Sequence, residues 1–192
     1  MLYIPPMLVI IIEAKTNSGE IQTMQDFDFK MIDSGHYAAM KYTGDEAHVI
    51  VPETYADLPV TVLFDRLFLG HPEITAVELP DGVTDLGEFM FEGCENLRSI
   101  RLPAQMTSMW PYAFAYSGLE EVRLPDGVTS IAPFAFKDCK NLKRVICGKG
   151  MRKIESWAFG GCDQLEEVVC GPDVEISPKA YESKKPWPNG LR

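Results

Sequence analysis

The sequence lacks every short motif that commonly marks a catalytic site. Its 192 residues contain no Gly-x-Ser-x-Gly, no His-Glu-x-x-His, no phosphate-binding glycine loop and no Cys-x-x-Cys. Only three histidines are present, His36, His48 and His71, and all precede most of the repeated region described below. Because general acid-base and nucleophilic catalysis need such groups at defined spacings, we predict a protein that is not an enzyme and needs no cofactor.

Basic residues and long apolar runs are also scarce. There are 18 lysines and arginines against 28 acidic residues, and the formal net charge is −10. Nucleic acids and anionic membranes attract basic surfaces, so we expect neither as a partner. No run approaches the roughly 18 apolar residues of a membrane span, and residues 1–12 are apolar without the basic segment and cleavage site of a signal peptide. The default expectation is a cytoplasmic protein, and the alternative is a cell-surface or secreted one.

What the sequence has is an internal repeat. A seven-residue segment ending in Leu-Pro begins at Ile74, Leu97 and Leu119, and it returns with Cys-Gly in place of Leu-Pro at Leu142 and Leu165. The steps between copies are 23, 22, 23 and 23 residues. A fixed period of this length is typical of a solenoid, in which each coil packs only on its neighbours.

Each position of the repeat has its own expected environment. In the copy that starts at Leu97, alternation directs Leu97, Ile100 and Leu102 inward, while Ser99 and Arg101 face out from a short parallel strand. The Pro-Asp-Gly that follows several strands predicts a turn in which glycine permits positive φ. One phenylalanine per coil is expected to form a buried column at the strand spacing of about 4.8 Å. Its members are Phe91, Phe114, Phe136 and Phe159.

The segments outside the repeat predict three parts. Residues 1–48 lack the repeat, and the alternating segment Phe27–Gly44, interrupted at Asp33–Gly35, predicts a β-hairpin within an N-terminal β cap. The solenoid is expected over residues 49–181, with an irregular first coil whose extra residues form a loop from Glu53 to Pro59. Residues 182–192, with two prolines, are predicted to be a C-terminal cap or tail.

The repeated string Leu-x-x-Ile/Val-x-Leu-Pro, Val-Thr-Ser-Ile, Ala-Phe-x-x-Cys-x-Asn-Leu is clearest from Leu119 to Leu142. It resembles the leucine-rich repeats of the BspA or Treponema type over residues 49–181. The resemblance implies a β-rich leucine-rich-repeat solenoid of about five 22–23-residue coils, closed by the N-terminal hairpin cap. Members of that family range from bacterial surface adhesin-like proteins to small uncharacterised chains. Departures are Cys147 and Cys170 in place of leucine and a one-residue deletion at Tyr116–Gly118.

The five cysteines are an odd number in a chain with enough apolar residues for a core, so we expect reduced thiols. His71, Cys94, Cys139 and Cys162 share one repeat position, but a column spreads its members over several coils, whereas zinc needs about four ligands within roughly 2.3 Å. We therefore predict no metal site. Asn96 and Asn141 are expected to bond backbone groups of the turn.

Two surface stripes are candidate binding sites. The outward positions of the strands form a strand face whose candidate contact residues for a protein are Arg101, Arg123, Arg144, Ile146 and Val169. A solvated face with cross-strand ion pairs explains the same pattern. The aromatic stripe, one ring per coil, comprises Phe89, Tyr112, Phe134 and Trp157. It forms either an open platform or ordinary packing.

The preferred interpretation is a non-catalytic recognition module that binds another protein, or a second copy of itself, through the strand face. The alternative is a carbohydrate-binding or adhesin-like surface module that uses the aromatic stripe.

Overall fold

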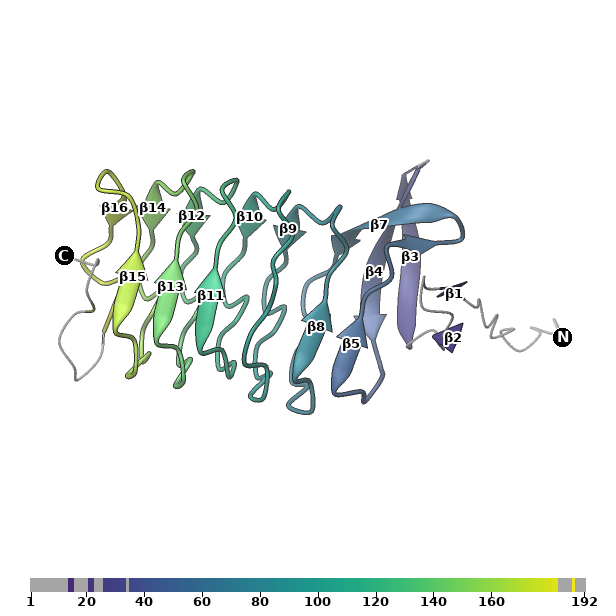
Figure 1. Ribbon diagram of the computed structural model, residues 1–192, viewed down its shortest axis with the longest axis horizontal. Helices are drawn as coiled ribbons and strands as arrows, with labels where there is room; N and C mark the ends of the chain where they lie inside the picture. Colours follow the sequence, from purple (N-terminus) through teal and green to yellow (C-terminus); the bar gives the residue numbers. More distant parts are fainter. Residues whose placement is uncertain (1–13, 16–20, 23–25, 34, 183–187, 189–192) are drawn as a thin grey trace, which may run out of the picture.

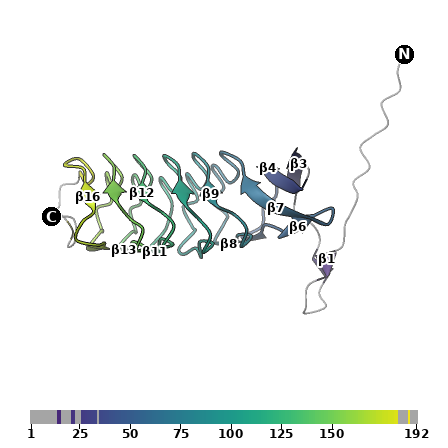
Figure 2. The same cartoon turned by 90° about the horizontal axis from the view of Figure 1, so that it is seen from above.

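The repeats form coils that are stacked along one axis. The computed structural model describes residues 14–15, 21–22, 26–33, 35–182 and 188. All regular structure in these residues is β-strand, and the chain winds from a sheet at the N-terminal end through a β-solenoid of about six turns. Figures 1 and 2 show the coils in file, with β3 and β4 at one end of the stack and β16 at the other. The predicted solenoid is confirmed, with one turn more than the five expected.

The Leu-x-x-Val-x-Leu segments form a row of short parallel strands along one side. β5 (His48–Ile50) pairs with β8 (Ala76–Glu78). Farther along, β11 (Glu121–Arg123), β13 (Arg144–Ile146) and β15 (Glu167–Val169) form a three-stranded sheet in strict register. The middle valine of each strand is buried, as alternation predicts.

A second row of two-residue parallel strands lies on another side of the solenoid. β9 (Asp85–Leu86) pairs with β10 (Ser108–Met109). β12 (Ser130–Ile131), β14 (Lys153–Ile154) and β16 (Glu175–Ile176) form a separate sheet. The second residue of each of the first four strands in this row is an apolar side chain that the core buries. The backbone groups of these strands are thus paired from coil to coil.

The phenylalanine column is the centre of the core. Phe68, Phe91, Phe114, Phe136 and Phe159 are each 0% exposed. Successive ring centroids are 5.2, 5.2, 5.4 and 5.7 Å apart, with the planes within 15° of parallel. The predicted single file is therefore confirmed, and Phe68 extends it by one coil. Stacked rings at this spacing follow from coils that lie one strand width apart.

The predicted hairpin covers the N-terminal end of the core. β3 (Phe27–Asp33) and β4 (His36–Tyr42) pair antiparallel, and β4 continues the sheet to β7 (Leu58–Leu63). The short pair of β1 (Ala14–Lys15) and β2 (Ile21–Gln22) precedes them. Aromatic rings from this sheet pack against the phenylalanine column. The ring centroids of Phe27 and Tyr42 lie 6.2 and 5.5 Å from that of Phe68. The exact boundary between cap and solenoid stays a prediction, because β7 follows the first coil in sequence yet pairs with the cap.

The loop expected from Glu53 to Pro59 is wrong. β6 (Thr54–Tyr55) turns directly into β7 and pairs with it antiparallel. The two turn residues, Ala56 and Asp57, have φ values of 48° and 64°. Positive φ at both positions defines the type I′ turn of a tight hairpin. Because these two positions hold neither Asn-Gly nor Asp-Gly, the turn gave no recognisable signal in the sequence.

The strand expected at residues 97–102 is also absent. No β-strand lies between β9 and β10, so the front row is divided into β5–β8 and β11–β13–β15. Leu97 and Leu102 are buried as predicted, but Ile100 is only partly buried, unlike the valines at its repeat position. The interruption lies in the coil that begins at Leu97, where the step to the next repeat, at Leu119, falls to 22 residues. This coil therefore lacks one residue that it would need to pair in register with the coils on both sides.

The Pro-Asp-Gly turns need glycine for a reason other than the one expected. Neither Gly82 nor Gly127 has positive φ. A Cβ atom at Gly127 would lie 2.6 Å from the carbonyl oxygen of Met106 in the preceding coil. Close approach between coils therefore selects this glycine. The predicted C-terminal tail lies almost wholly outside the described residues.

Candidate functional site

The strand face is built by the register of the front sheet. Arg123, Ile146 and Val169 are directly opposite one another on β11, β13 and β15, and Glu121, Arg144 and Glu167 form the parallel row beside them. The structure thus brings four of the five predicted contact residues together. The fifth, Arg101, lies in the interrupted coil, outside the sheet.

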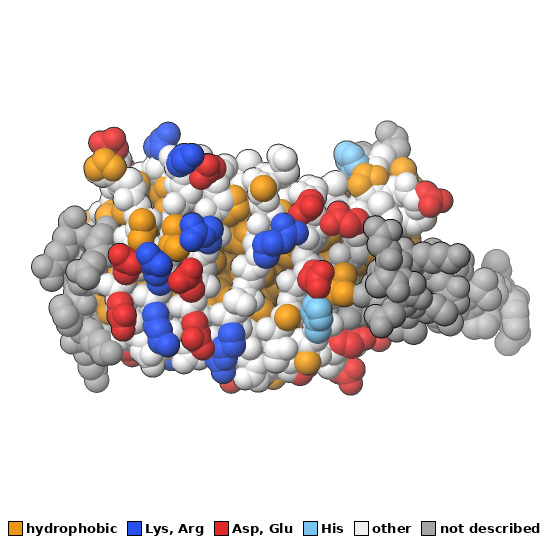
Figure 3. Space-filling view, in the orientation of Figure 1, with side chains coloured by type: hydrophobic (Ala, Val, Ile, Leu, Met, Phe, Trp, Pro, Cys, Tyr) orange, Lys and Arg blue, Asp and Glu red, His pale blue; other side chains and the backbone are white. Residues whose placement is uncertain are grey.

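Charges on the strand face are only partly neutralised. Arg144 donates through Nε to Glu167 Oε2 at 2.7 Å, and Arg101 Nη2 lies 2.9 Å from Asp81 Oδ1. Within the described part of the chain, Arg123 has no ion-pair partner. Val169 is 39% exposed and Ile146 is partly exposed. Figure 3 shows basic and acidic side chains mixed with apolar ones over these coils, so the face combines one unpaired cation with adjacent apolar side chains.

The aromatic stripe is a stack of half-buried rings. Centroid distances are 5.0 Å from Phe89 to Tyr112, 4.9 Å from Tyr112 to Phe134 and 6.3 Å from Phe134 to Trp157. All four residues have φ between 56° and 63°, a conformation unusual for bulky side chains. The guanidinium of Arg66 lies 5.1 Å from the Phe89 ring centroid at the first end of the stack.

The rings of the aromatic stripe expose their edges to solvent rather than their faces. Adjacent planes are within 13° of parallel, so each ring covers the face of the next. A sugar ring binds an aromatic side chain through the face, and the inner faces here are already occupied. The geometry therefore favours packing over an open carbohydrate platform. Trp110, in the neighbouring position, is 52% exposed.

The cysteine column consists of buried thiols. Cys94, Cys139 and Cys162 each place Sγ 2.9–3.2 Å from the carbonyl oxygen of the column phenylalanine one coil earlier. Burial raises the pKa of Cys94 and of Cys147 to about 12, which opposes formation of the reactive thiolate. Among the residues that the structure describes, no group of three His, Cys, Asp or Glu side chains is placed to hold a metal ion.

The asparagines of the repeat behave differently from one another. Asn96 donates through Nδ2 to the carbonyl oxygen of Pro72 at 2.8 Å, as predicted. Asn141, at the corresponding position two coils later, makes no side-chain hydrogen bond with any described residue. The expectation that both amides satisfy the turn therefore holds only for Asn96.

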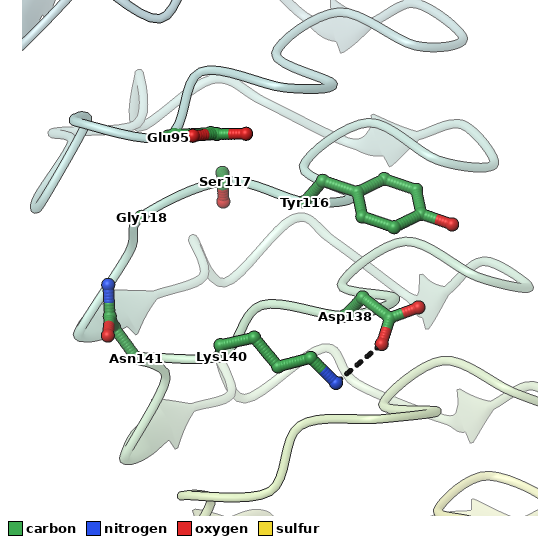
Figure 4. A pocket seen from close by; sticks show the side chains of 7 residues that line it. All are labelled: Glu95, Tyr116, Ser117, Gly118, Asp138, Lys140 and Asn141. Carbon is green, nitrogen blue, oxygen red and sulfur yellow. Dashed lines mark ion pairs between the residues drawn. The ribbon is translucent and has the colours of Figure 1, made fainter.

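Asn141 instead lines a pocket of about 410 Å³ that sequence analysis did not predict. The pocket lies between the coil of Glu95 and the coil of Asp138, beside Tyr116–Gly118. Figure 4 shows the Asn141 side chain extending toward Gly118 on one side, with Tyr116, Asp138 and Lys140 on the other. The signal for it was the one-residue deletion at residues 116–118, which sequence analysis noted only as a departure from the repeat.

Comparison with known proteins now gives the family. Six copies of the BspA type leucine-rich repeat region match residues 61–186, more than half of the chain. The chain belongs to the BspA-type leucine-rich repeat family. Its repeats are thus leucine-rich repeats, whose general role is protein interaction, and this family is one of repeat proteins rather than of enzymes. No curated protein is significantly similar to the chain.

Solved structures agree with this assignment. A leucine-rich repeat protein of T. pallidum is 26% identical, with a TM-score of 0.65 over 78% of this chain and 82% of that one. Leucine-rich repeat proteins of Bacteroides ovatus and Bacteroides capillosus are 23% and 24% identical, with TM-scores of 0.58 and 0.57. They cover 76% and 65% of this chain, and 46% and 95% of their own. The last two show the leucine-rich-repeat fold alone.

The described residues include no helix that is long and apolar enough to cross a membrane.

Proposed function

We propose that this leucine-rich repeat protein binds another protein, or a second copy of itself, through the strand face. The row formed by Arg123, Ile146 and Val169 carries the proposal. Protein contacts concentrate their binding energy in a few side chains that become fully desolvated, and arginine is enriched among them. This row places a guanidinium, which has no ion-pair partner in the described part of the chain, beside two apolar side chains on neighbouring strands.

Rigidity supports the same choice. The three strands are held in register by backbone hydrogen bonds and by a core in which Val122, Val145 and Val168 are at most 1% exposed. A preorganised surface loses little conformational entropy on binding. The ion pair between Arg144 and Glu167 fixes the neighbouring row of side chains as well, although an exposed pair of this kind stabilises the fold by less than about 1 kcal/mol.

The charge of the chain defines the preferred partner. With a net charge of −10, the protein attracts basic surfaces, repels acidic ones and has no net attraction to neutral ones. Arg123 is a local positive charge on this acidic protein, and it can pair with one carboxylate of the partner. No catalytic group, metal or cofactor is needed for such a role.

The test replaces two apolar side chains of the row with acids. We expect the double variant Ile146→Asp/Val169→Asp to fold normally and to lose association by about tenfold or more, because it buries two unpaired charges in the contact. The matched control, Val62→Asp/Leu69→Asp, adds the same charge at exposed apolar positions outside the strand face and is expected to behave like the parent.

Two measurements decide the outcome. Sedimentation velocity reports self-association, and crosslinking in the native cell followed by mass spectrometry reports other partners. Equal association of the strand-face variant and the parent would overturn the proposal. A monomeric parent that crosslinks to no protein would overturn it as well.

A further inference from the structure

The pocket beside Tyr116–Gly118 exists because one coil is short. The step from Leu97 to Leu119 is 22 residues instead of 23. Gly118 then passes so close to the preceding coil that a Cβ atom there would lie 2.1 Å from the carbonyl oxygen of Glu95. A cavity of about 410 Å³ lies beside this shortened segment, within the range of small-ligand sites.

At one repeat position beside the pocket the residue type differs from that of the other coils, although the backbone conformation is the same. Tyr116 and Asp138 have φ values of 57° and 55°, at the repeat position where Gly70, Gly93 and Gly161 adopt the same left-handed conformation. Glycine adopts this conformation without strain, whereas tyrosine does not. The two coils that border the pocket thus carry side chains at a position where their neighbours have glycine.

Most hydrogen-bond donors at the pocket already have partners within the protein. Lys140 Nζ lies 2.6 Å from Asp138 Oδ1 and 3.4 Å from Asp163 Oδ2, and it donates to the carbonyl oxygen of Gly161 at 2.8 Å. These three contacts use all the protons of its ammonium group. Ser117 is buried, with Oγ 3.4 Å from Cys139 Sγ. Neither residue has a donor left for a ligand.

Several hydrogen-bond acceptors at the pocket, in contrast, have no partner among the described residues. The carboxylate of Glu95 and the amide of Asn141 make no side-chain hydrogen bond or ion pair with any described residue. Asp138 uses one oxygen for Lys140. Glu95, Asp138 and Asn141 therefore present several acceptor oxygens against the single NH₂ donor group of Asn141. A ligand for this pocket must mainly donate.

Two further cations, Arg98 and Lys137, contact residues that line the pocket. Arg98 Nη1 donates to the carbonyl oxygen of Gly118 at 3.1 Å. Lys137 Nζ lies 5.7 Å from the centroid of the Tyr116 ring, which shows that this 40% exposed ring at the pocket rim already attracts a cation. Among the side chains that line the pocket, two carboxylates oppose one lysine.

We propose that this pocket binds the guanidinium group of an arginine side chain presented by a partner protein. A guanidinium carries five N–H donors and no acceptor, and its planar fork matches a carboxylate such as Glu95 in two parallel hydrogen bonds. Asn141 Oδ1 can accept a further N–H, and Tyr116 offers an aromatic ring at the rim. The net charge of −10 attracts basic partners from a distance.

The position of the pocket connects it with the strand face. Gly118 and Asn141 each precede the first residue of a front strand, β11 or β13, by three residues. A protein that covers the strand face would therefore lie beside the pocket. The inference rests on the proposed function for the source of the arginine, but binding of a guanidinium to the pocket can be measured without any partner.

The test is a titration of the whole chain, labelled with ¹⁵N, with N-acetyl-arginine N-methylamide. We expect saturable shifts of the Gly118 and Asn141 amide signals, with a dissociation constant on the order of 1–10 mM for one isolated side chain. The citrulline analogue has the same shape without the charge, and we expect it to cause no saturable shift. Equal responses to the two probes would overturn the proposal, and so would saturation by glucose but not by the arginine probe.

Two variants assign the effect to the pocket. Glu95→Gln is expected to weaken binding of the arginine probe about tenfold, because a charge-assisted pair becomes a neutral one. Glu121→Gln removes one carboxylate on the strand face and is expected to leave the affinity unchanged. An unchanged affinity in Glu95→Gln would contradict the inference. Because Ile146→Asp/Val169→Asp should leave probe binding intact, failure of the pocket and failure of the strand face are distinguishable.

Discussion

The coils from Leu119 to Val169 and the coil from Leu97 to Gly118 are built from nearly the same sequence, yet they differ in structure. In the first region every step is 23 residues, and β11, β13 and β15 pair without a register shift. In the second region the step is 22 residues, no front strand forms, and a pocket opens beside Gly118.

What the two regions share is the interior. Phe114, in the short coil, is as fully buried as Phe136, and both stack on their neighbours at nearly the same distance. A missing residue is therefore absorbed at the surface while the core keeps its order. This follows from energetics, because a displaced core ring forfeits several kcal/mol, whereas an exposed strand of three residues contributes little.

The largest expected effect concerns the shared interior. Phe136→Ala should lower the free energy of unfolding by about 3–5 kcal/mol, through lost burial and the cavity left behind. Phe134→Ala, only two residues away, removes a half-buried ring of the aromatic stripe and should cost clearly less. Urea denaturation of both variants measures the difference, and equal losses would contradict the distinction between the column and the stripe.

A smaller effect separates the short coil from the last one. Gly118→Ala forces a methyl group against the carbonyl oxygen of Glu95, and overpacking of this kind costs about 1–3 kcal/mol. Gly171→Ala is the control, since nothing lies within 4 Å of a Cβ atom at Gly171. Thermal denaturation of the two variants should show a lower melting temperature for Gly118→Ala only. Full tolerance at Gly118 would mean that the coils do not approach so closely.

The pH dependence of stability distinguishes the buried thiol column from Cys170. Burial raises the pKa of Cys94 to about 12, whereas a thiol in the unfolded chain ionises near about 8.5. The contribution of the protonated Cys94 thiol to folding stability is complete below the thiol pKa of the unfolded chain. It is lost as the pH rises toward 12, at up to about 1.4 kcal/mol per pH unit. In denaturation between pH 8 and 10.5, Cys94→Ala should flatten this decline, and Cys170→Ala, at a half-buried site, should flatten it less. A decline that Cys94→Ala leaves unchanged would contradict the assignment.

Much of the fold could be predicted because the repeat fixes position. A period of 22–23 residues places Phe91, Phe114, Phe136 and Phe159 at the same point of successive coils, so their column followed from spacing alone. The hairpin at Phe27–Tyr42 followed from alternation around a turn signal. The hairpin at Ala56 and Asp57 did not, because its left-handed turn contains neither glycine nor asparagine.

The candidate sites were harder to predict, because repeat position gives the location of a side chain but not its contacts. Repeat position predicted which residues share the strand face, but it could not show that Arg144 has a carboxylate partner while Arg123 has none among the described residues. It predicted one role for Asn96 and Asn141, and the two differ because the short coil leaves Asn141 beside a cavity. A break in the period was the only sequence signal of the pocket.

Hydrogen exchange tests the central comparison most directly. In the native protein, peptides covering residues 119–125 and 142–148 should exchange slowly, because β11 and β13 lie within a paired sheet. The peptide covering residues 97–103 should exchange faster, because Ser99, Ile100 and Arg101 belong to no strand. Mass spectrometry of the three peptides over time gives the answer. Equal protection in all three would show that the short coil is paired like the others, and the account of both the interrupted sheet and the pocket would then be wrong.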